Sequence, residues 1–311
     1  MRGLEARLRF DGPLDLAATW RPLGVPFSDP TVCANDSHAV RASRTPEGPA
    51  TLHVAIEDAG ELALRAWGDG ARWMIEHAAA SLGLDDAPFA PPANAPRALQ
   101  RLAQQAAGDR LARTGRVVEL LVPIVLEQLV SGAEASRAYA RLVRTFSDRA
   151  PGPFPDLWLP LGAEQIRAIP MAAFPACGAL ARQGATLHEL ARRATRVEEA
   201  AQLPHDEADR RLRAFPGVGP WTSRSAMLRG MGFPDAVPLG DYHLPSIVAW
   251  NLAGEAKADD ARMLELLEPW RGQRGRIVRW ITYAGAMPAR RSPRAALREV
   301  DPEARALLRR S

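Results

Sequence analysis

The sequence predicts an α+β fold in which a small antiparallel sheet with two helices precedes an all-α domain. Apolar and polar residues alternate in short runs through roughly the first 85 of the 311 positions, and apolar residues then recur at helical spacing. Between these regions, residues 85–96 contain four prolines, which remove backbone donors and disfavour helix. We therefore expect an N-terminal α+β domain over 1–85, a proline-rich linker over 86–97 and an all-α domain over 98–311.

The alternation in the first domain is clearest where turn sequences interrupt it. Apolar residues occupy every second position on both sides of Asp58-Ala59-Gly60, and this arrangement predicts a β-hairpin. Asp11-Gly12-Pro13 likewise ends an alternating run with residues that favour a turn. Strands are expected over 4–10, 39–44, 52–56 and 62–66, and helices on one face of the sheet over 14–23 and 70–82.

The second domain is expected to be helical throughout. Its apolar residues recur three and four positions apart, and no convincing strand pattern follows residue 100. Pro123 lies within the first long apolar segment and is expected to kink it. Helices are predicted over 117–129, 134–147, 163–169, 186–202 and 206–215.

The basic residues are almost all arginine. Lysine and arginine total 40 against 36 acidic residues, the formal net charge is +4, and Lys257 is the single lysine. A genomic coding bias is the simplest explanation. The near absence of lysine has a chemical consequence: almost no side-chain amine is available for Schiff-base chemistry, because a guanidinium stays protonated. The positive charge suits a polyanionic partner.

Cysteine usage and hydropathy argue against several classes of protein. Cys33 and Cys177 are isolated, so the spacings of zinc and iron–sulfur sites are missing and a disulfide framework is unsupported. The sequence has no run of about 18 apolar residues and no signal-peptide core in its first residues. We expect a soluble cytoplasmic protein with no metal site and no membrane contact.

A glycine-rich turn between two helices is the first candidate functional motif. Residues 215–222 are Phe-Pro-Gly-Val-Gly-Pro-Trp-Thr. Gly217 and Gly219 allow a partner to approach the backbone closely, and the free N–H groups at the start of the next helix can bind an anion. On DNA that anion would be a phosphate. The alternative is a plain corner between two helices.

Asp241 is the second candidate. It stands in Gly-Asp-Tyr-His-Leu (240–244), directly before an apolar helical segment that ends at Gly254. A carboxylate at this position caps a helix and is stabilised there as the anion. Capping alone would explain the residue, but the same negative charge is suited to stabilising a cation that develops nearby.

Together, the two motifs resemble those of helix-hairpin-helix DNA glycosylases, and within that superfamily the 3-methyladenine DNA glycosylase II family. The combination is specific, whereas either motif alone is not. Residues 126–131, Leu-Glu-Gln-Leu-Val-Ser, and the small N-terminal sheet extend the resemblance. It implies that the all-α domain is a helix-hairpin-helix glycosylase domain. Such an enzyme flips an alkylated purine out of DNA and hydrolyses its N-glycosidic bond, as the first step of base excision repair.

The resemblance also implies roles for individual residues. Asp241 matches the catalytic carboxylate that stabilises an oxocarbenium-like sugar. Trp221 stands where lyase-type relatives carry a lysine, so no lyase activity is expected, and its indole can stack on a cationic purine. Tyr242 and Trp280 are further candidates for the base pocket. Leu129 matches the wedge that fills the gap left by the flipped base. Core packing is the alternative for both Trp221 and Leu129.

The hairpin residues Gly217, Val218, Gly219 and Thr222 match the phosphate-binding part of the family motif. The resemblance implies no organic cofactor, although hairpin carbonyls in this motif can hold a monovalent cation that bridges to a phosphate. The expected partner is damaged double-stranded DNA, bound by a monomer.

Three features depart from the family pattern. Ser225 lies one turn after Trp221, where relatives often carry a tyrosine. Glu127 replaces a small residue close to the expected DNA, where phosphates would repel it unless an arginine pairs with it. The arginine-rich tail over 288–311 has no clear counterpart. Two other functions stay open: a glycosylase of the same superfamily for other base lesions, and a non-catalytic helix-hairpin-helix DNA-binding protein.

Overall fold

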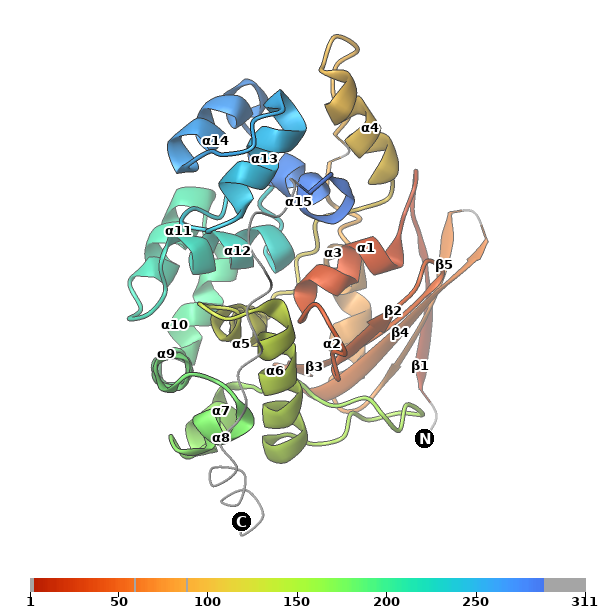
Figure 1. Ribbon diagram of the computed structural model, residues 1–311. Coiled ribbons are helices and arrows are strands. Elements are labelled where there is room, and N and C mark those ends of the chain that lie inside the picture. The colour runs from red at the N-terminus through yellow and green to blue at the C-terminus, as the bar shows by residue number, and fades with distance from the viewer. Residues whose placement is uncertain (1–2, 59, 88, 288–311) are drawn as a thin grey trace.

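The computed structural model describes residues 3–58, 60–87 and 89–287 and has the predicted α+β architecture (Figure 1). One antiparallel sheet has the strand order β1-β5-β4-β3-β2. Its strands are β1 (Leu4–Arg9), β2 (Val32–Ala34), β3 (His38–Thr45), β4 (Gly48–Asp58) and β5 (Glu61–Trp67). The four predicted strands are confirmed. Strand β2 escapes prediction because three residues are too few to show alternation.

The predicted hairpin of β4 and β5 contributes apolar residues to the buried face of the sheet. Leu52 pairs with Ala66, and Val54 pairs with Leu64, so the apolar residues of β4 and β5 lie opposite one another. Helices α1 (Leu16–Trp20), α2 (Ala71–Glu76) and α3 (Ala78–Ser81) contribute to the same buried cluster. The Trp20 indole N–H donates to the Ser81 carbonyl at 2.9 Å and joins α1 to α3.

The rest of the described chain is helical, and no further strand occurs in residues 68–87 or 89–287. The helices are α4 (Arg97–Gln105), α5 (Val117–Leu126), α6 (Gly132–Phe146), α7 (Ala163–Ala168), α8 (Ala173–Cys177), α9 (Ala181–Arg192), α10 (Ala194–Glu198), α11 (His205–Arg213), α12 (Pro220–Gly230), α13 (Leu244–Ala253), α14 (Asp260–Leu267) and α15 (Arg274–Ala284). Short 3₁₀ turns are η1 (Arg21–Leu23), η2 (Glu199–Gln202) and η3 (Glu268–Trp270).

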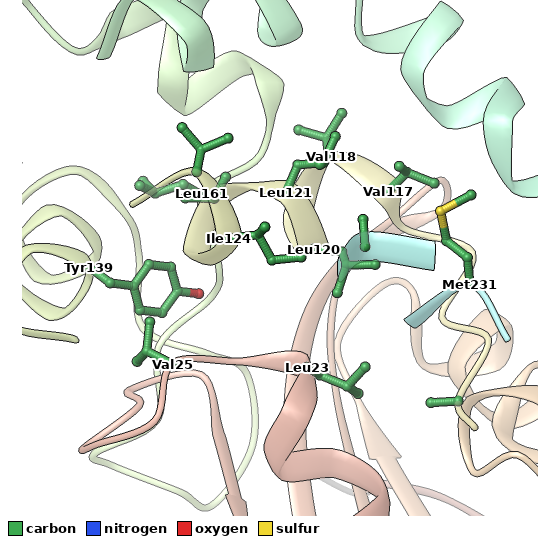
Figure 2. Packing of buried hydrophobic residues seen from close by; sticks show 14 of the residues in the cluster. Leu23, Val25, Val117, Val118, Leu120, Leu121, Ile124, Tyr139, Leu161 and Met231 are labelled. Atoms are coloured by element: carbon green, nitrogen blue, oxygen red, sulfur yellow. The ribbon is translucent and has the colours of Figure 1, made fainter. Parts of the chain in front are cut away.

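Apart from a small apolar cluster of Ala42, Ala150, Leu157 and Leu159, two apolar clusters form the core of the described chain. The larger one joins the inner face of the sheet to helix α5, all of whose residues are buried, and to α6. Figure 2 shows its centre, where Leu23 and Val25 of the N-terminal region face Ile124 and Tyr139. The smaller cluster joins α4 to α13 and α15. The division into domains at 86–97 stays a prediction from composition, and the arginine-rich tail over 288–311 lies outside the described residues.

A buried carboxylate fixes α5 against the sheet. Glu119 is 4% exposed, and its two oxygens accept hydrogen bonds from the Arg44 backbone N–H at 2.6 Å and the Ser43 hydroxyl at 2.8 Å. The Arg41 guanidinium pairs with the same carboxylate at 3.4 Å. Because α5 leads directly into residues 127–131, this anchor positions the loop that carries Leu129.

The described residues show the following about membrane spans, metal-ligand groups and thiols. None of its helices combines the length and apolar character needed to cross a bilayer. No group of three or more His, Cys, Asp or Glu side chains is arranged there to hold a metal ion. Both cysteines are free thiols, with Cys33 exposed and Cys177 buried.

The buried thiol makes stability depend on pH in the alkaline range. Burial raises the pKa of Cys177 to about 11, whereas an unfolded cysteine ionises near pH 8.5. Because the folded-state pKa is the higher one, the thiol stabilises the fold below the unfolded pKa, and this contribution is lost as the pH rises towards 11. We compare the free energy of unfolding in urea at about pH 8 and about pH 10.5. Over this range it should fall by about 1–3 kcal/mol more in the unchanged protein than in Cys177→Ala. Parallel losses would contradict this assignment.

Candidate active site and nucleic-acid interface

A pocket of about 110 Å³ lies between α12, α15 and the chain just before α13. One ordered water needs about 10–15 Å³, so the pocket is several times larger than a single-water site. Turn η1 of the N-terminal region closes one side through Pro22. The lining residues are Pro22, Trp221, Ser225, Leu228, Arg229, Pro238, Asp241, Leu244, Val278, Arg279, Thr282 and Tyr283.

Asp241 is held in this pocket through both carboxylate oxygens. Its Oδ1 accepts the backbone N–H groups of His243 and Leu244 at 2.8 and 2.9 Å and closes the turn before α13, whose N-cap residue is His243. Its Oδ2 accepts the indole N–H of Trp221 at 2.9 Å. The expected capping position is thus two residues too early, and the Asp241 side chain is fixed from both sides.

Trp221 and Ser225 form one wall of the pocket. They lie one helical turn apart on α12, so both side chains face the same way. Trp221 is half-buried, and its indole is oriented by the hydrogen bond to Asp241. Ser225 is 3% exposed and contributes a small side chain to the wall, at the position where relatives often carry a tyrosine.

Tyr242 and Trp280 do not line the pocket, and their assignment to it is corrected. The Tyr242 side chain is 91% exposed and points away beside His243. Trp280 is 4% exposed and packs in the smaller core cluster, where its ring stacks on Phe89 with centroids 5.8 Å apart. The face of α15 that reaches the pocket instead carries Val278, Arg279, Thr282 and Tyr283. Tyr283 is the aromatic residue that the sequence analysis missed.

The glycine hairpin between α11 and α12 has two different glycines. Gly217 has a φ of +82°, and a Cβ there would lie 1.9 Å from the Thr186 hydroxyl oxygen, so no other residue fits. Gly219 is the N-cap of α12, and a Cβ there would meet no atom within 4 Å. The backbone at Gly219 therefore faces open space at a helix N-terminus.

The other two hairpin candidates point inward. Val218 is 5% exposed and belongs to the larger core cluster, so it anchors the hairpin. Thr222 is 2% exposed, and its hydroxyl accepts a hydrogen bond from the Gln128 side chain at 2.8 Å. The Thr222 side chain is thus used to hold the neighbouring loop, and a phosphate contact of Thr222 stays a prediction.

Leu129 lies in the loop between α5 and α6. It is 69% exposed and has a φ of +60°, a strained conformation for a residue with a Cβ. Helix α5 ends at Leu126, earlier than the predicted 129, so Leu129 is not a core residue. The strain is maintained by two glutamines. Gln128 donates to the Gly217 carbonyl at 3.0 Å, and buried Gln183 donates to the Gln128 carbonyl at 2.8 Å.

Glu127 has the arginine partner that its position requires. Arg229 of α12 donates two hydrogen bonds to its carboxylate, at 2.9 and 2.7 Å. Burial alone would lower the pKa of Arg229, but the Glu127 and Asp241 carboxylates raise it, and the net change is upward. The pair neutralises Glu127 and ties the Leu129 loop to the wall of the pocket.

The two hairpin glycines should differ in what their substitution changes: Gly217→Ala should lower stability, and Gly219→Ala should weaken binding. Gly217→Ala forces a Cβ into Thr186 at a positive φ and should lower the free energy of unfolding by about 2–4 kcal/mol. Gly219→Ala has space and an ordinary φ, so stability should change by less than about 1 kcal/mol. Its methyl group should still weaken duplex binding, because it occupies the space where a phosphate would approach. Equal stability of the two variants in urea would contradict this account.

Solved structures with the same fold are DNA glycosylases. A 3-methyladenine DNA-glycosylase from Archaeoglobus fulgidus superposes with a TM-score of 0.72 at 17% identity, covering 89% of this chain and 97% of that one. A Clostridium acetobutylicum 8-oxoguanine glycosylase/lyase bound to double-stranded DNA gives a TM-score of 0.66 at 12% identity, covering 91% and 97%. At these identities the comparison shows that the fold is shared, and no more.

Two proteins related in sequence point to one kind of DNA glycosylase. The chain is 30% identical over 176 residues to DNA-3-methyladenine glycosylase 2 of Escherichia coli (strain K12), over 56% of this chain and 61% of that protein. It is 32% identical over 154 residues to a probable bifunctional transcriptional activator/DNA repair enzyme AlkA of Mycobacterium tuberculosis, over 47% of this chain and 29% of that protein. The chain therefore spans less than two thirds of either relative. No protein-family model matches it. The predicted resemblance to 3-methyladenine DNA glycosylase II, among the helix-hairpin-helix DNA glycosylases, is confirmed.

Proposed function

We propose that this chain is a monofunctional DNA glycosylase that removes alkylated purines from double-stranded DNA. The observation that carries the proposal is the Asp241 carboxylate, fixed inside a pocket by the Trp221 indole and two backbone N–H groups. Closing the turn before α13 needs only the contacts with the backbone. The additional contact with Trp221 orients the carboxylate beside the pocket wall on which a flipped base would stack.

The proposed chemistry follows from charge. A purine alkylated at N3 or N7 carries a positive charge in the nucleotide and departs as a neutral base with the electron pair of the glycosidic bond, so it needs little help from a general acid. Cleavage of the bond to C1′ leaves an oxocarbenium-like sugar, to which water adds before losing a proton. Asp241 is proposed to stabilise this positive charge and to orient the water. The flipped base would stack on Trp221 by cation–π attraction.

The remaining charges in the pocket are compatible with a cationic base. Arg229 lines the pocket, but Glu127 pairs with it through two hydrogen bonds, so its charge is largely neutralised there. Arg279 also lines the pocket and is paired with Asp109. Ser225 leaves the wall open beside Trp221, and we infer that this space admits the substituent of the damaged base.

DNA binding is proposed to use the hairpin and the Leu129 loop. Phosphate would be bound by the backbone at Gly217 and Gly219, at the N-terminus of α12. Leu129 would fill the gap left by the flipped base, which would offset part of the few kcal/mol that extrusion costs. We propose binding as a monomer without an organic cofactor. A monovalent cation on the hairpin carbonyls stays a prediction.

The substrate class is tested by the bases that are released. Duplex DNA treated with a methylating agent is incubated with the protein, and free bases are separated by chromatography. We expect methylated purines to be released, and their order, with hypoxanthine included, defines the specificity. Release of 8-oxoguanine from a matched oxidised duplex, with no methylated purine, would favour a glycosylase for other lesions.

A further inference from the structure

We propose that Phe27 is a second apolar side chain that enters the minor groove of the damaged duplex, beside Leu129. This inference rests on the proposed function and extends it to the N-terminal region. Phe27 lies in the segment between η1 and β2, and its ring is 59% exposed. No role for this segment follows from the sequence motifs.

The backbone at Phe27 has the same type of strain as the Leu129 loop. Ser28, the next residue, has a φ of +52°, and Leu129 has a φ of +60°. Within the described residues these are the only positive φ values outside glycine. Such strain costs roughly 1–3 kcal/mol and persists where surrounding contacts impose it, often at binding sites. The strained Ser28 directly follows the exposed Phe27, and the strained Leu129 is itself a large exposed apolar residue.

A carboxylate holds the Phe27 loop rigidly. Asp29 accepts the backbone N–H of Val25 at 2.8 Å and that of Thr31 at 2.7 Å, and so closes the loop on both sides of Phe27. A Cβ on Gly24 would lie 2.0 Å from the Asp29 carboxylate, so glycine is required there. The Phe27 N–H itself donates to the Ser136 hydroxyl of α6 at 3.2 Å. The exposure of the ring is therefore imposed by the structure.

The loop lies between the pocket and Leu129. At one end Pro22 lines the pocket. At the other end a Cβ on Gly132 would lie 3.4 Å from the Pro26 ring and 3.8 Å from the Phe27 ring. Gly132 follows Leu129 by three residues, which can span at most about 11 Å. Phe27 and Leu129 thus belong to one surface, which Gln128 connects to the hairpin.

Duplex DNA is the partner that this surface fits. Proteins that kink DNA insert apolar side chains, Phe and Leu among them, between base steps in the minor groove. A loop whose backbone is already fixed loses little backbone freedom when its exposed ring stacks, so the contact retains more of its free energy. Leu129 would occupy the gap left by the lesion, and Phe27 would enter a neighbouring base step from the adjacent loop.

The test uses a duplex with a tetrahydrofuran abasic-site analogue and 2-aminopurine at the neighbouring base step. We expect Phe27→Ala to weaken binding about tenfold and to abolish the rise in 2-aminopurine fluorescence that accompanies unstacking. Its melting temperature should stay near that of the unchanged protein. Phe27→Leu should retain most of the affinity. Leu4→Ala, at an exposed leucine of strand β1, is the matched control and should bind normally.

Three results would overturn the inference: unchanged binding and fluorescence in Phe27→Ala, an equal loss in Leu4→Ala, or a loss of affinity fully explained by a lower melting temperature. Failure of the unchanged protein to bind the duplex would instead overturn the proposed function.

Discussion

Replacing Asp241 with asparagine is expected to slow base excision by about 100-fold or more, while duplex affinity stays close to that of the unchanged protein. Asparagine keeps one oxygen for the backbone N–H groups of His243 and Leu244, so the turn that leads into α13 is retained. It removes the negative charge and sets an amide N–H₂ against the Trp221 indole N–H. The loss should therefore lie in the chemical step, measured as the single-turnover rate on a methylated duplex.

Asp259→Asn is the matched control for this experiment. Asp259 caps α14 through the Arg262 backbone N–H at 2.9 Å and lies outside the pocket. Its variant should excise at the normal rate, because only the cap is altered and asparagine also caps well. An Asp241→Asn enzyme with near-normal excision would show that Asp241 only begins a helix.

Replacing Arg279 with methionine is expected to lower the free energy of unfolding by about 3–5 kcal/mol. Arg279 is 3% exposed, and its Nε donates to Asp109 at 2.9 Å while Nη2 donates to the Ala18 carbonyl at 2.8 Å. The guanidinium thus joins α15, a wall of the pocket, to α1 of the N-terminal region. Its removal leaves the Asp109 carboxylate buried without its partner.

The double variant Arg279→Met with Asp109→Leu shows how much of the stability loss comes from the unpaired Asp109 carboxylate and how much from lost packing. Removing both charges should recover most of the stability, because a buried ion pair is often no better than an apolar pair of similar volume. Burial already raises the pKa of Asp109, although Arg279 opposes this, so protonation relieves the unpaired carboxyl. The single variant should therefore approach the double variant as the pH falls towards the folded-state pKa of Asp109. A constant difference in urea unfolding at every pH would contradict this explanation.

Local patterns were sufficient to predict most of the architecture. The alternation around Asp58-Ala59-Gly60 defined β4 and β5, and the helical spacing after residue 100 defined the all-α part. The glycine hairpin and Asp241 were found because each motif lies within a few consecutive residues. Their juxtaposition in one pocket came from the family resemblance, since twenty residues separate Trp221 from Asp241.

The errors arose where a contact depends on tertiary packing. Trp280 and Arg279 are adjacent in sequence, and only the rotation of α15 decides which residues reach the pocket. Periodicity placed Leu129 at the end of a helix that in fact stops at Leu126, where Gln183 takes the free carbonyl. The Glu127 partner lies 102 residues away on α12. No local pattern identifies such a pair, although charge alone predicted that an arginine was needed.

Removal of a base without strand cleavage is tested by counting strand breaks in a methylated duplex, with and without hot alkali. Trp221 occupies the hairpin position of the lyase lysine, and Lys257 is not among the residues that line the pocket. We therefore predict breaks that appear only after alkali, in excess of those given by Asp241→Asn and by DNA alone. Breaks without alkali would reveal lyase activity, and no excess of breaks would reveal a DNA-binding protein without catalysis. Either result would contradict the account.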